Sequence, residues 1–300
     1  MRRFTSFEAR IDSVAHRVLD RLPAQGPAGA LVEFAVFGLK QAWACLFGGL
    51  LLALIIATHY LWPENAVLAR YDFLFLAAVV IQVLMLAGGL EQPSEAKVIL
   101  IFHVVGTVME VFKTSAGSWI YPEESVFRVA AVPLFSGFMY AAVGSYLARI
   151  SRIFDMRYTH YPALWMTLVL AAAIYANFFA HHYTVDVRYG LFAATALLFA
   201  RTTVHYRVFR FRHRMPLLLG FLLVAVFIWF AENIGTWSRA WIYPDQSGGW
   251  TPVSISKLGS WYLLMIISFV LVSVVHRPRT PDEAPLKDIP AGAGRADASG

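Results

Sequence analysis

Charged side chains are scarce in this sequence. Only 15% of its 300 residues are Asp, Glu, Lys or Arg, whereas 58% are hydrophobic and the mean hydropathy is +0.58. In soluble domains about a quarter of the residues are charged. This shortage excludes an ordinary soluble domain and indicates that lipid surrounds much of the chain.

Cysteine and the common ligand-binding motifs are also nearly absent. Cys45 is the single cysteine, which excludes a disulfide within the chain. There is no phosphate-binding loop, no dinucleotide-binding glycine pattern and no serine nucleophile elbow. His59, His181 and His182 match no metal-ligand spacing. We therefore predict neither a cofactor nor a metal. The basic residues form short clusters instead of a basic domain, so no nucleic-acid partner is predicted either.

Long apolar runs are what the sequence has in abundance. A bilayer core about 30 Å thick needs roughly 20 apolar residues as helix. Eight segments meet or approach this length, and the sequence predicts an all-α, polytopic transmembrane helical bundle with the lipid bilayer as its main partner. The predicted spans are 41–60, 73–90, 98–114, 129–148, 162–180, 190–204, 216–234 and 258–275.

Two terminal segments flank these spans. In segment 1–40, Phe4, Phe7 and Ile11 recur at helical spacing opposite Arg10 and Arg17, which predicts an amphipathic helix on the cytoplasmic membrane surface. Segment 277–300 is rich in Pro, Ala, Gly and Asp and is predicted to be a disordered cytoplasmic tail.

The basic clusters indicate an orientation, because cytoplasmic loops accumulate Lys and Arg. The clusters precede the first span and follow the fourth, sixth and eighth, which predicts a plasma (bacterial inner) membrane protein with both termini in the cytoplasm. They comprise Arg2, Arg3, Arg10, Arg17, Arg21 and Lys40; Arg149, Arg152 and Arg157; Arg207, Arg210, Arg212 and Arg214; and Arg277 and Arg279.

An internal duplication divides the chain. The tetrapeptide Trp-Ile-Tyr-Pro occurs at 119–122 and again at 241–244, and the same offset aligns Glu110 with Glu232 and Tyr140 with Tyr262. We predict two four-helix repeats, 41–150 and 160–276. Each has an even number of spans, so the repeats run in parallel and are related by an axis along the membrane normal.

The two glutamates are the candidate catalytic residues. A carboxylate inside a membrane is costly unless it is protonated, paired or facing water, so Glu110 and Glu232 are functional candidates. The alternative is local neutralisation by Lys113 and Arg239, which lie one and two turns further along. His103 lies on the same helical face as Glu110 and is a candidate proton partner.

Aromatic residues near the glutamates are candidate substrate-binding groups. The alternative is that the Trp-Ile-Tyr-Pro elements anchor the chain at the membrane interface, where Trp and Tyr are favoured. The candidates are Trp119, Tyr121, Trp241, Tyr243, Tyr140 and Tyr262.

Several motifs resemble an uncharacterised family of bacterial integral membrane proteins, catalogued as domain of unknown function 817. The motifs are Lys-Gln-Ala-Trp-Ala at 40–44, Glu-Val-Phe-Lys at 110–113, Gly-Ser-Trp-Ile-Tyr-Pro-Glu at 117–123 and Val-Pro-Leu-Phe-Ser-Gly-Phe-Met-Tyr at 132–140. The resemblance covers 35–276 and implies a helical membrane fold without implying an activity.

A weaker similarity is to the membrane carotenoid hydratases and small-subunit lycopene cyclases, through Glu110, Gly117, Trp119 and Tyr121. It implies a protonated carboxylic acid that protonates an alkene of a hydrophobic small molecule, with aromatic faces stabilising the cation. Arg239 stands where the first repeat has Gly117, which departs from a symmetric pair of sites. A small-solute or proton-coupled transporter and a non-catalytic scaffold remain the alternatives.

Overall fold

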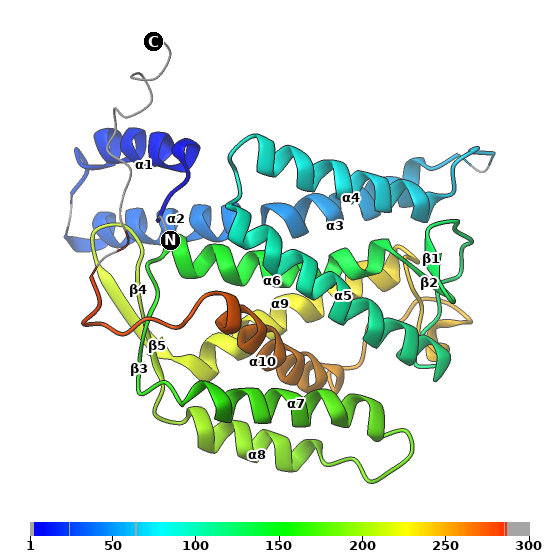
Figure 1. Cartoon of the computed structure of the whole chain (residues 1–300). Helices are drawn as coiled ribbons and strands as arrows, with labels where there is room; N and C mark the ends of the chain where they lie inside the picture. Colours follow the sequence, from blue (N-terminus) through cyan, green and yellow to red (C-terminus); the bar gives the residue numbers. More distant parts are fainter. Residues whose placement is uncertain (1–2, 24, 64, 285, 287–300) are drawn as a thin grey trace, which may run out of the picture.

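The structure is a computed structural model that describes residues 3–23, 25–63, 65–284 and 286. In this part of the chain ten α-helices account for most residues (Figure 1). They are α1 (Ser6–Leu19), α2 (Gly26–Ala44), α3 (Leu46–Leu61), α4 (Arg70–Ala87), α5 (Pro93–Ser115), α6 (Phe135–Ile153), α7 (Leu164–Ala180), α8 (Arg188–Phe199), α9 (Leu217–Trp237) and α10 (Lys257–Val275), with a short 3-10 helix at Pro244–Gln246.

The helices α3 to α10 form the bundle, and each overlaps one of the eight predicted spans. By length and apolar composition α4, α5, α9 and α10 can each cross a membrane, and α2 with α3, bent by 68° at their junction, can form one further broken span. The apolar helices α7 and α8 are shorter. A helical bundle with four or five spans is thus supported, and a total of eight stays a prediction.

Several helices expose long apolar faces. Soluble monomers seldom present such large continuous apolar surfaces, so these faces indicate a lipid environment. The exposed side chains include Leu76, Val80, Val83 and Leu84 of α4; Leu100, Val104 and Val108 of α5; Trp165, Leu168 and Val169 of α7; and Leu219, Leu223, Phe227 and Phe230 of α9.

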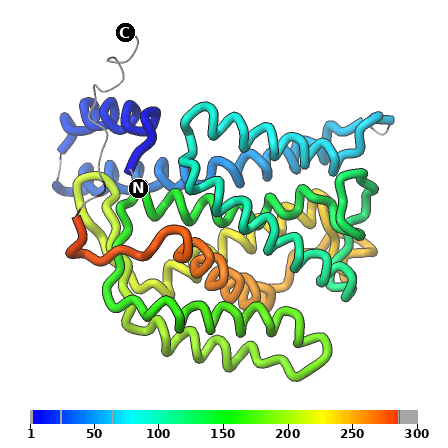
Figure 2. Tube along the Cα trace, viewed as in Figure 1, coloured from blue at the N-terminus to red at the C-terminus, as the bar shows by residue number. Residues whose placement is uncertain are grey.

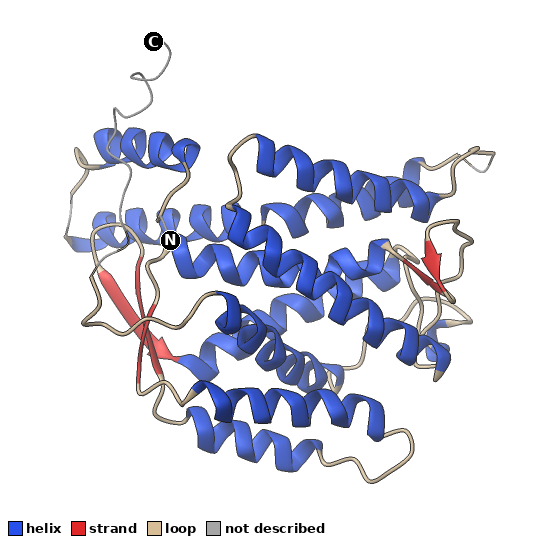
Figure 3. Ribbon diagram, in the orientation of Figure 1, coloured by secondary structure: helices blue, strands red, loops and turns tan. Residues whose placement is uncertain are grey.

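Small β-sheets lie at both ends of the bundle (Figure 3), so the all-α prediction is incomplete. One end carries the hairpin of β1 (Arg128–Val129) and β2 (Val132–Pro133); the other carries the antiparallel sheet of β3 (Arg157–Thr159), β4 (Thr203–Arg207) and β5 (Arg212–Pro216). The predicted helix was wrong over 129–133 and 203–204. Short apolar runs do not distinguish strand from helix, and β-branched Val and Thr favour strands.

The amino-terminal segment packs on the bundle. Glu8 of α1 is buried, accepts a hydrogen bond from the Trp43 indole (2.9 Å) and pairs with Arg152 of α6. The outward face of α1 exposes Phe7 and Ile11, as an interfacial helix would. The second helix, α2, runs through residue 40, where the sequence predicts the boundary between the surface segment and the first span.

Two arginines expected in a cytoplasmic loop are instead fully buried in α6. Arg149 pairs with Glu91 (2.8 Å), and Arg152 pairs with Glu95 (3.0 Å) and with Glu8; both arginine side chains are 0% exposed. The sequence places Arg149 and Arg152 in the connection after the fourth span, which it ends at residue 148, whereas α6 continues to Ile153 and includes both. Sequence position alone does not reveal buried acidic partners, and the orientation of the chain stays a prediction.

Residues 277–284 are held on the three-stranded sheet, at the same end as α1 (Figure 2), whereas the sequence predicts a disordered tail from 277. The Tyr158 amide donates to the Arg279 carbonyl (2.7 Å), and Arg279 pairs with Asp155 (2.8 Å). Burial acts to raise the pKa of Asp155, but its ion pairs with Arg212, Arg157 and Arg279 together hold that pKa below its ordinary value. The rest of the predicted tail, residue 285 and residues 287–300, lies outside the described residues.

Candidate functional site

Glu110, near the end of α5, is buried among neutral hydrogen-bond donors. It is 4% exposed and accepts bonds from the Trp119 indole (2.8 Å) and from the hydroxyls of Tyr121 (2.6 Å) and Tyr140 (2.6 Å). Trp119 and Tyr121 belong to the segment that follows α5, whereas Tyr140 projects from α6. One carboxyl group therefore joins two helices and a loop.

Glu232, near the end of α9, repeats much of this arrangement. It is 6% exposed and accepts bonds from the Trp241 indole (2.9 Å) and the Tyr243 hydroxyl (2.6 Å). The donors again lie nine and eleven residues after the glutamate. In the part of the chain that the structure describes, Tyr262, the counterpart of Tyr140, does not bond Glu232; its ring packs near Phe192.

Similar turns bring each tryptophan back to its glutamate. After α5, Gly117 adopts a left-handed backbone (φ 72°) and the Ser118 amide bonds the Lys113 carbonyl (2.9 Å). After α9, Arg239 adopts the same conformation (φ 56°) and the Ala240 amide bonds the Gly235 carbonyl (3.0 Å). Such turns usually end in Gly, because other residues are strained there. Arg239 nevertheless adopts the positive φ, and the same backbone hydrogen bond forms, so the Gly-to-Arg difference between the two segments leaves the fold of this turn unchanged.

The two Trp-Ile-Tyr-Pro elements lie side by side. Ile120 and Ile242 each donate their amide to the other's carbonyl, and both bonds are 3.0 Å long. The Trp119 ring meets the Tyr243 ring edge-on, with centroids 6.1 Å apart. Contacts therefore run from Glu110 through Trp119 and Tyr243 to Glu232.

Both glutamates line one small cavity of about 40 Å³. This volume is enough for a few water molecules. The other lining residues are mostly aromatic: Trp119, Tyr121, Ser136, Met139, Tyr140, Trp241, Tyr243 and Trp261. Burial raises the pKa values of Tyr121 and Tyr243 well above their ordinary value, and the negative charge of the neighbouring glutamate raises each of them further. Their hydroxyls therefore stay protonated and able to donate.

The local ion pairs that the sequence offered as an alternative are not found among the described residues. Lys113 contacts His181 (3.4 Å) and His182 (3.1 Å) instead of Glu110, and Arg239 makes no ion pair. Neither glutamate has a Lys or Arg within ion-pairing distance in the same part of the chain. Only neutral donors bond the two carboxyl groups there.

Two sequence candidates lie away from this cavity. The His103 ring packs on Phe138 (4.5 Å), and its buried Nδ1 finds no hydrogen-bond partner among the described residues. Neither His103 nor Tyr262 lines the glutamate cavity. The pattern on α5 puts His103 and Glu110 on one helical face, but they are separated by almost two turns.

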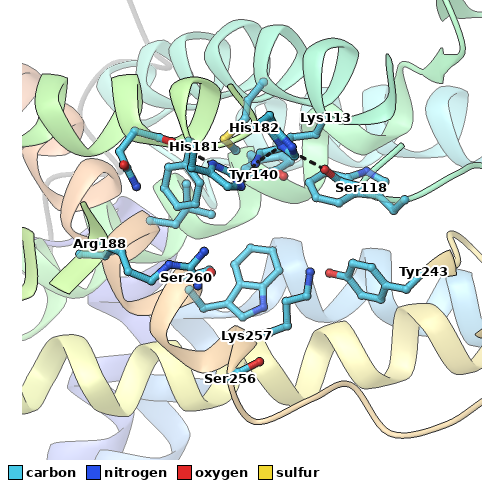
Figure 4. Close-up of a pocket in the computed structure, with 17 residues that line it drawn as sticks. Lys113, Ser118, Tyr140, His181, His182, Arg188, Tyr243, Ser256, Lys257 and Ser260 are labelled. Carbon is cyan, nitrogen blue, oxygen red and sulfur yellow. Dashed lines mark hydrogen bonds between the residues drawn. The ribbon is translucent and has the colours of Figure 1, made fainter. Parts of the chain in front are cut away.

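A larger cavity of about 270 Å³ adjoins the first and shares Trp119, Tyr140, Tyr243 and Trp261 with it (Figure 4). Its basic residues were not among the sequence candidates, because α5, the α7–α8 loop, α8 and α10 contribute them from distant parts of the chain. They are Lys113, His181, His182, Arg188 and Lys257. A weak signal was available: Arg188 and Lys257 each begin an apolar helix.

Comparisons with known proteins find relatives over most of the chain. An uncharacterised protein of Bacillus subtilis (strain 168), YoaT, is 41% identical over 258 residues, which are 86% of this chain and 96% of that protein. Two solved structures, a mycobacterial Insig homologue, MvINS, from Mycobacterium vanbaalenii and a cross-linked MvINS trimer, are each 17% identical with a TM-score of 0.44; each match covers 63% of this chain and 98% of the other. The family model described as "Protein of unknown function (DUF817)" matches residues 33–269, and the chain belongs to this family.

Proposed function

We propose that the chain is a multi-pass protein of the bacterial plasma membrane with eight spans, α3–α6 and α7–α10 forming two parallel repeats and both termini lying in the cytoplasm. The duplicated hydrogen bonds of Glu110 and Glu232 and the matching turns after α5 and α9 support the repeat. Two residues that exchange both backbone bonds in an antiparallel pair are related by a local twofold axis. Ile120 and Ile242, which do so, are equivalent positions of the two repeats.

The activity we propose is acid-dependent chemistry on an isoprenoid or another lipid, with Glu110 and Glu232 as the proton-transferring groups. One observation carries this proposal: the two buried carboxyl groups share an aromatic-lined cavity and have no cation paired with them among the described residues. A carboxylic acid can protonate an alkene only if it is held in its acid form within reach of the substrate, away from bulk water.

The proposed step conserves atoms and charge. The acid O–H bond breaks, the alkene π electrons form a new C–H bond, and a cation remains on the neighbouring carbon. Loss of a proton from an adjacent carbon to the carboxylate restores the acid and leaves an isomerised or cyclised product. Trp119, Trp241 and Trp261 line the cavity, and their π faces can stabilise the cation.

Lipid analysis tests this activity. In a strain lacking the chain's own gene, we expect wild-type protein to restore a lipid component and Glu110→Gln and Glu232→Gln each to abolish at least 90% of that restoration, because general acid catalysis contributes about 10²- to 10⁴-fold. Extracted lipids are compared by mass spectrometry at matched protein levels. Glu124→Gln is the control, because Glu124 is an exposed carboxylate that lines neither cavity.

The outcomes separate three functions. Identical lipid profiles in the deletion strain, the wild type and both variants would rule out the enzyme. Glutamate-dependent proton flux in proteoliposomes across a panel of small solutes would then favour a transporter. If neither lipid change nor flux depends on Glu110 or Glu232, a non-catalytic scaffold remains.

A further inference from the structure

The larger cavity carries an excess of positive charge. Lys113, Arg188 and Lys257 line it, and Figure 4 shows Lys113 along one side with Arg188 and Lys257 along the other. Asp186, which pairs with Arg188, is the single carboxylate bonded to any of the three among the described residues. The wall of this cavity therefore attracts anions.

Lys113 is the most deeply buried of these cations. It is only 6% exposed, and its ammonium lies near the Nε2 atoms of His181 and His182 and over the Phe178 ring (5.6 Å to the centroid), with no carboxylate bonded to it among the described residues. Burial, together with the charge of Lys113, lowers the pKa of His182, so this imidazole is neutral at neutral pH and can accept from the ammonium. A buried ammonium without a carboxylate partner is costly unless another anion approaches.

Two helices add their amino-terminal ends. Arg188 is the first residue of α8 and Lys257 the first of α10, and both residues line the cavity. Helix amino termini carry partial positive charge and amide donors, which favour anions. At α8 the Asp186 carboxylate already accepts from the Arg188 amide (3.0 Å), so this terminus is partly neutralised. At α10 the amides of Lys257 and Leu258 bond the Ser254 and Ile255 carbonyls (2.9 and 3.0 Å), and Ser256, the residue before the helix, makes no side-chain cap. The partial positive charge of this terminus therefore has no capping side chain.

The indole N–H of Trp261, a hydrogen-bond donor without an acceptor among the described residues, is a separate indication of a ligand. Trp261 lines both cavities, and this N–H is buried. A buried donor without a partner costs about 1–3 kcal/mol. An oxygen atom of a bound anion can satisfy it.

We infer that the larger cavity binds the phosphate group of an amphiphilic ligand, a phosphate or diphosphate ester with a hydrocarbon chain. Lys113 and Lys257, which bond no carboxylate among the described residues, suit a phosphate together with Arg188, which is shared with Asp186, because a phosphate carries up to two charges and offers several acceptor oxygens. Apolar walls take the hydrocarbon, because the cavity is larger than a phosphate needs. These walls are formed by Met109, Phe178, Trp261, Leu263 and Leu264.

The inference that the larger cavity binds an anion depends only on the geometry of that cavity. The further assignment of this ester as the substrate rests on the proposed function. Because Trp119, Tyr140, Tyr243 and Trp261 line both cavities, the carbon atoms next to the bound phosphate would face the glutamate pair.

A binding experiment on purified full-length protein in a non-ionic detergent tests the inference. Dodecyl phosphate, dodecanol, inorganic phosphate and inorganic diphosphate are titrated while tryptophan fluorescence is recorded. We expect dodecyl phosphate to bind at least tenfold more tightly than the other three, and Lys113→Gln and Lys257→Gln each to weaken it about 10- to 100-fold, the usual range for a charged hydrogen bond. The matched control is Lys97→Gln, an exposed lysine near the opposite end of α5.

Each outcome decides between ligands. Unchanged dodecyl phosphate affinity in a folded Lys113→Gln/Lys257→Gln double variant would overturn the inference, as would equal binding of dodecanol. Inorganic phosphate or diphosphate binding as tightly as the ester would replace the lipid ligand by a free anion. Size-exclusion profiles and thermal unfolding establish that the variants fold. Binding that persists in Glu110→Gln while the lipid profiles show no activity would refute the enzyme and leave the anion site standing.

Discussion

Replacing Arg152 by Met is expected to lower the free energy of unfolding by about 3–5 kcal/mol. The arginine is 0% exposed and pairs with both Glu8 and Glu95, which are themselves buried. Met fills much of the same volume but leaves two carboxylates without their cation. Thermal unfolding of the detergent-solubilised protein, followed by tryptophan fluorescence, measures the loss.

Arg212→Met is the matched control. Arg212 also pairs with an acidic residue, Asp155, but its side chain is 45% exposed, so water can take over the lost contact. A change of at most about 1 kcal/mol is expected there. If Arg152→Met proved as mild as Arg212→Met, the buried network between α1, α5 and α6 would not exist as described.

Replacing Gly235 by Ala is expected to destabilise the protein by about 1–3 kcal/mol and to detach Trp241 from Glu232. A Cβ atom at position 235 would lie 2.0 Å from Cη2 of the Trp241 indole, far inside van der Waals contact. The indole must move, and with it the donor that bonds Glu232. Thermal unfolding gives the energetic cost, and the fluorescence spectrum gives the change around the indole.

Gly190→Ala provides the comparison, because no atom lies within 4 Å of the added Cβ in α8. There Ala should be neutral or stabilising by up to about 1 kcal/mol, since Gly is the poorer helix former. Equal unfolding temperatures for the two alanine variants would contradict the close packing of Trp241 on α9.

Much of the helical framework could be predicted from hydropathy. Each predicted span is largely helical, because continuous apolar runs of this length form helices in lipid. The first, 41–60, is not one straight helix: it includes the end of α2 and most of α3, which are bent by 68°. The duplication also shows that Trp119 and Tyr121 have the same spacing from Glu110 as Trp241 and Tyr243 have from Glu232. The sequence predicts these aromatic residues as substrate-binding groups, however, and only the structure shows that they donate hydrogen bonds to the two carboxyl groups.

The remaining features depend on partners that a linear pattern does not reveal. Arg149 and Arg152 look like loop charges until Glu91, Glu95 and Glu8 are found beside them. The basic cavity is assembled from residues far apart in the chain, none of which is unusual by itself. His103 shared a helical face with Glu110, but face alone does not fix position along the helix, and its ring packs on α6.

We propose that Glu110 and Glu232 belong to one site, and a double-mutant cycle on stability tests this most directly. Unfolding free energies are measured for the wild type, Glu110→Gln, Glu232→Gln and the double variant. Groups that share a cavity and a chain of contacts should couple by at least about 0.5 kcal/mol, in either sign, whereas independent sites add to within about 0.3 kcal/mol. A coupling energy above that threshold is the predicted result; strict additivity would contradict a shared site.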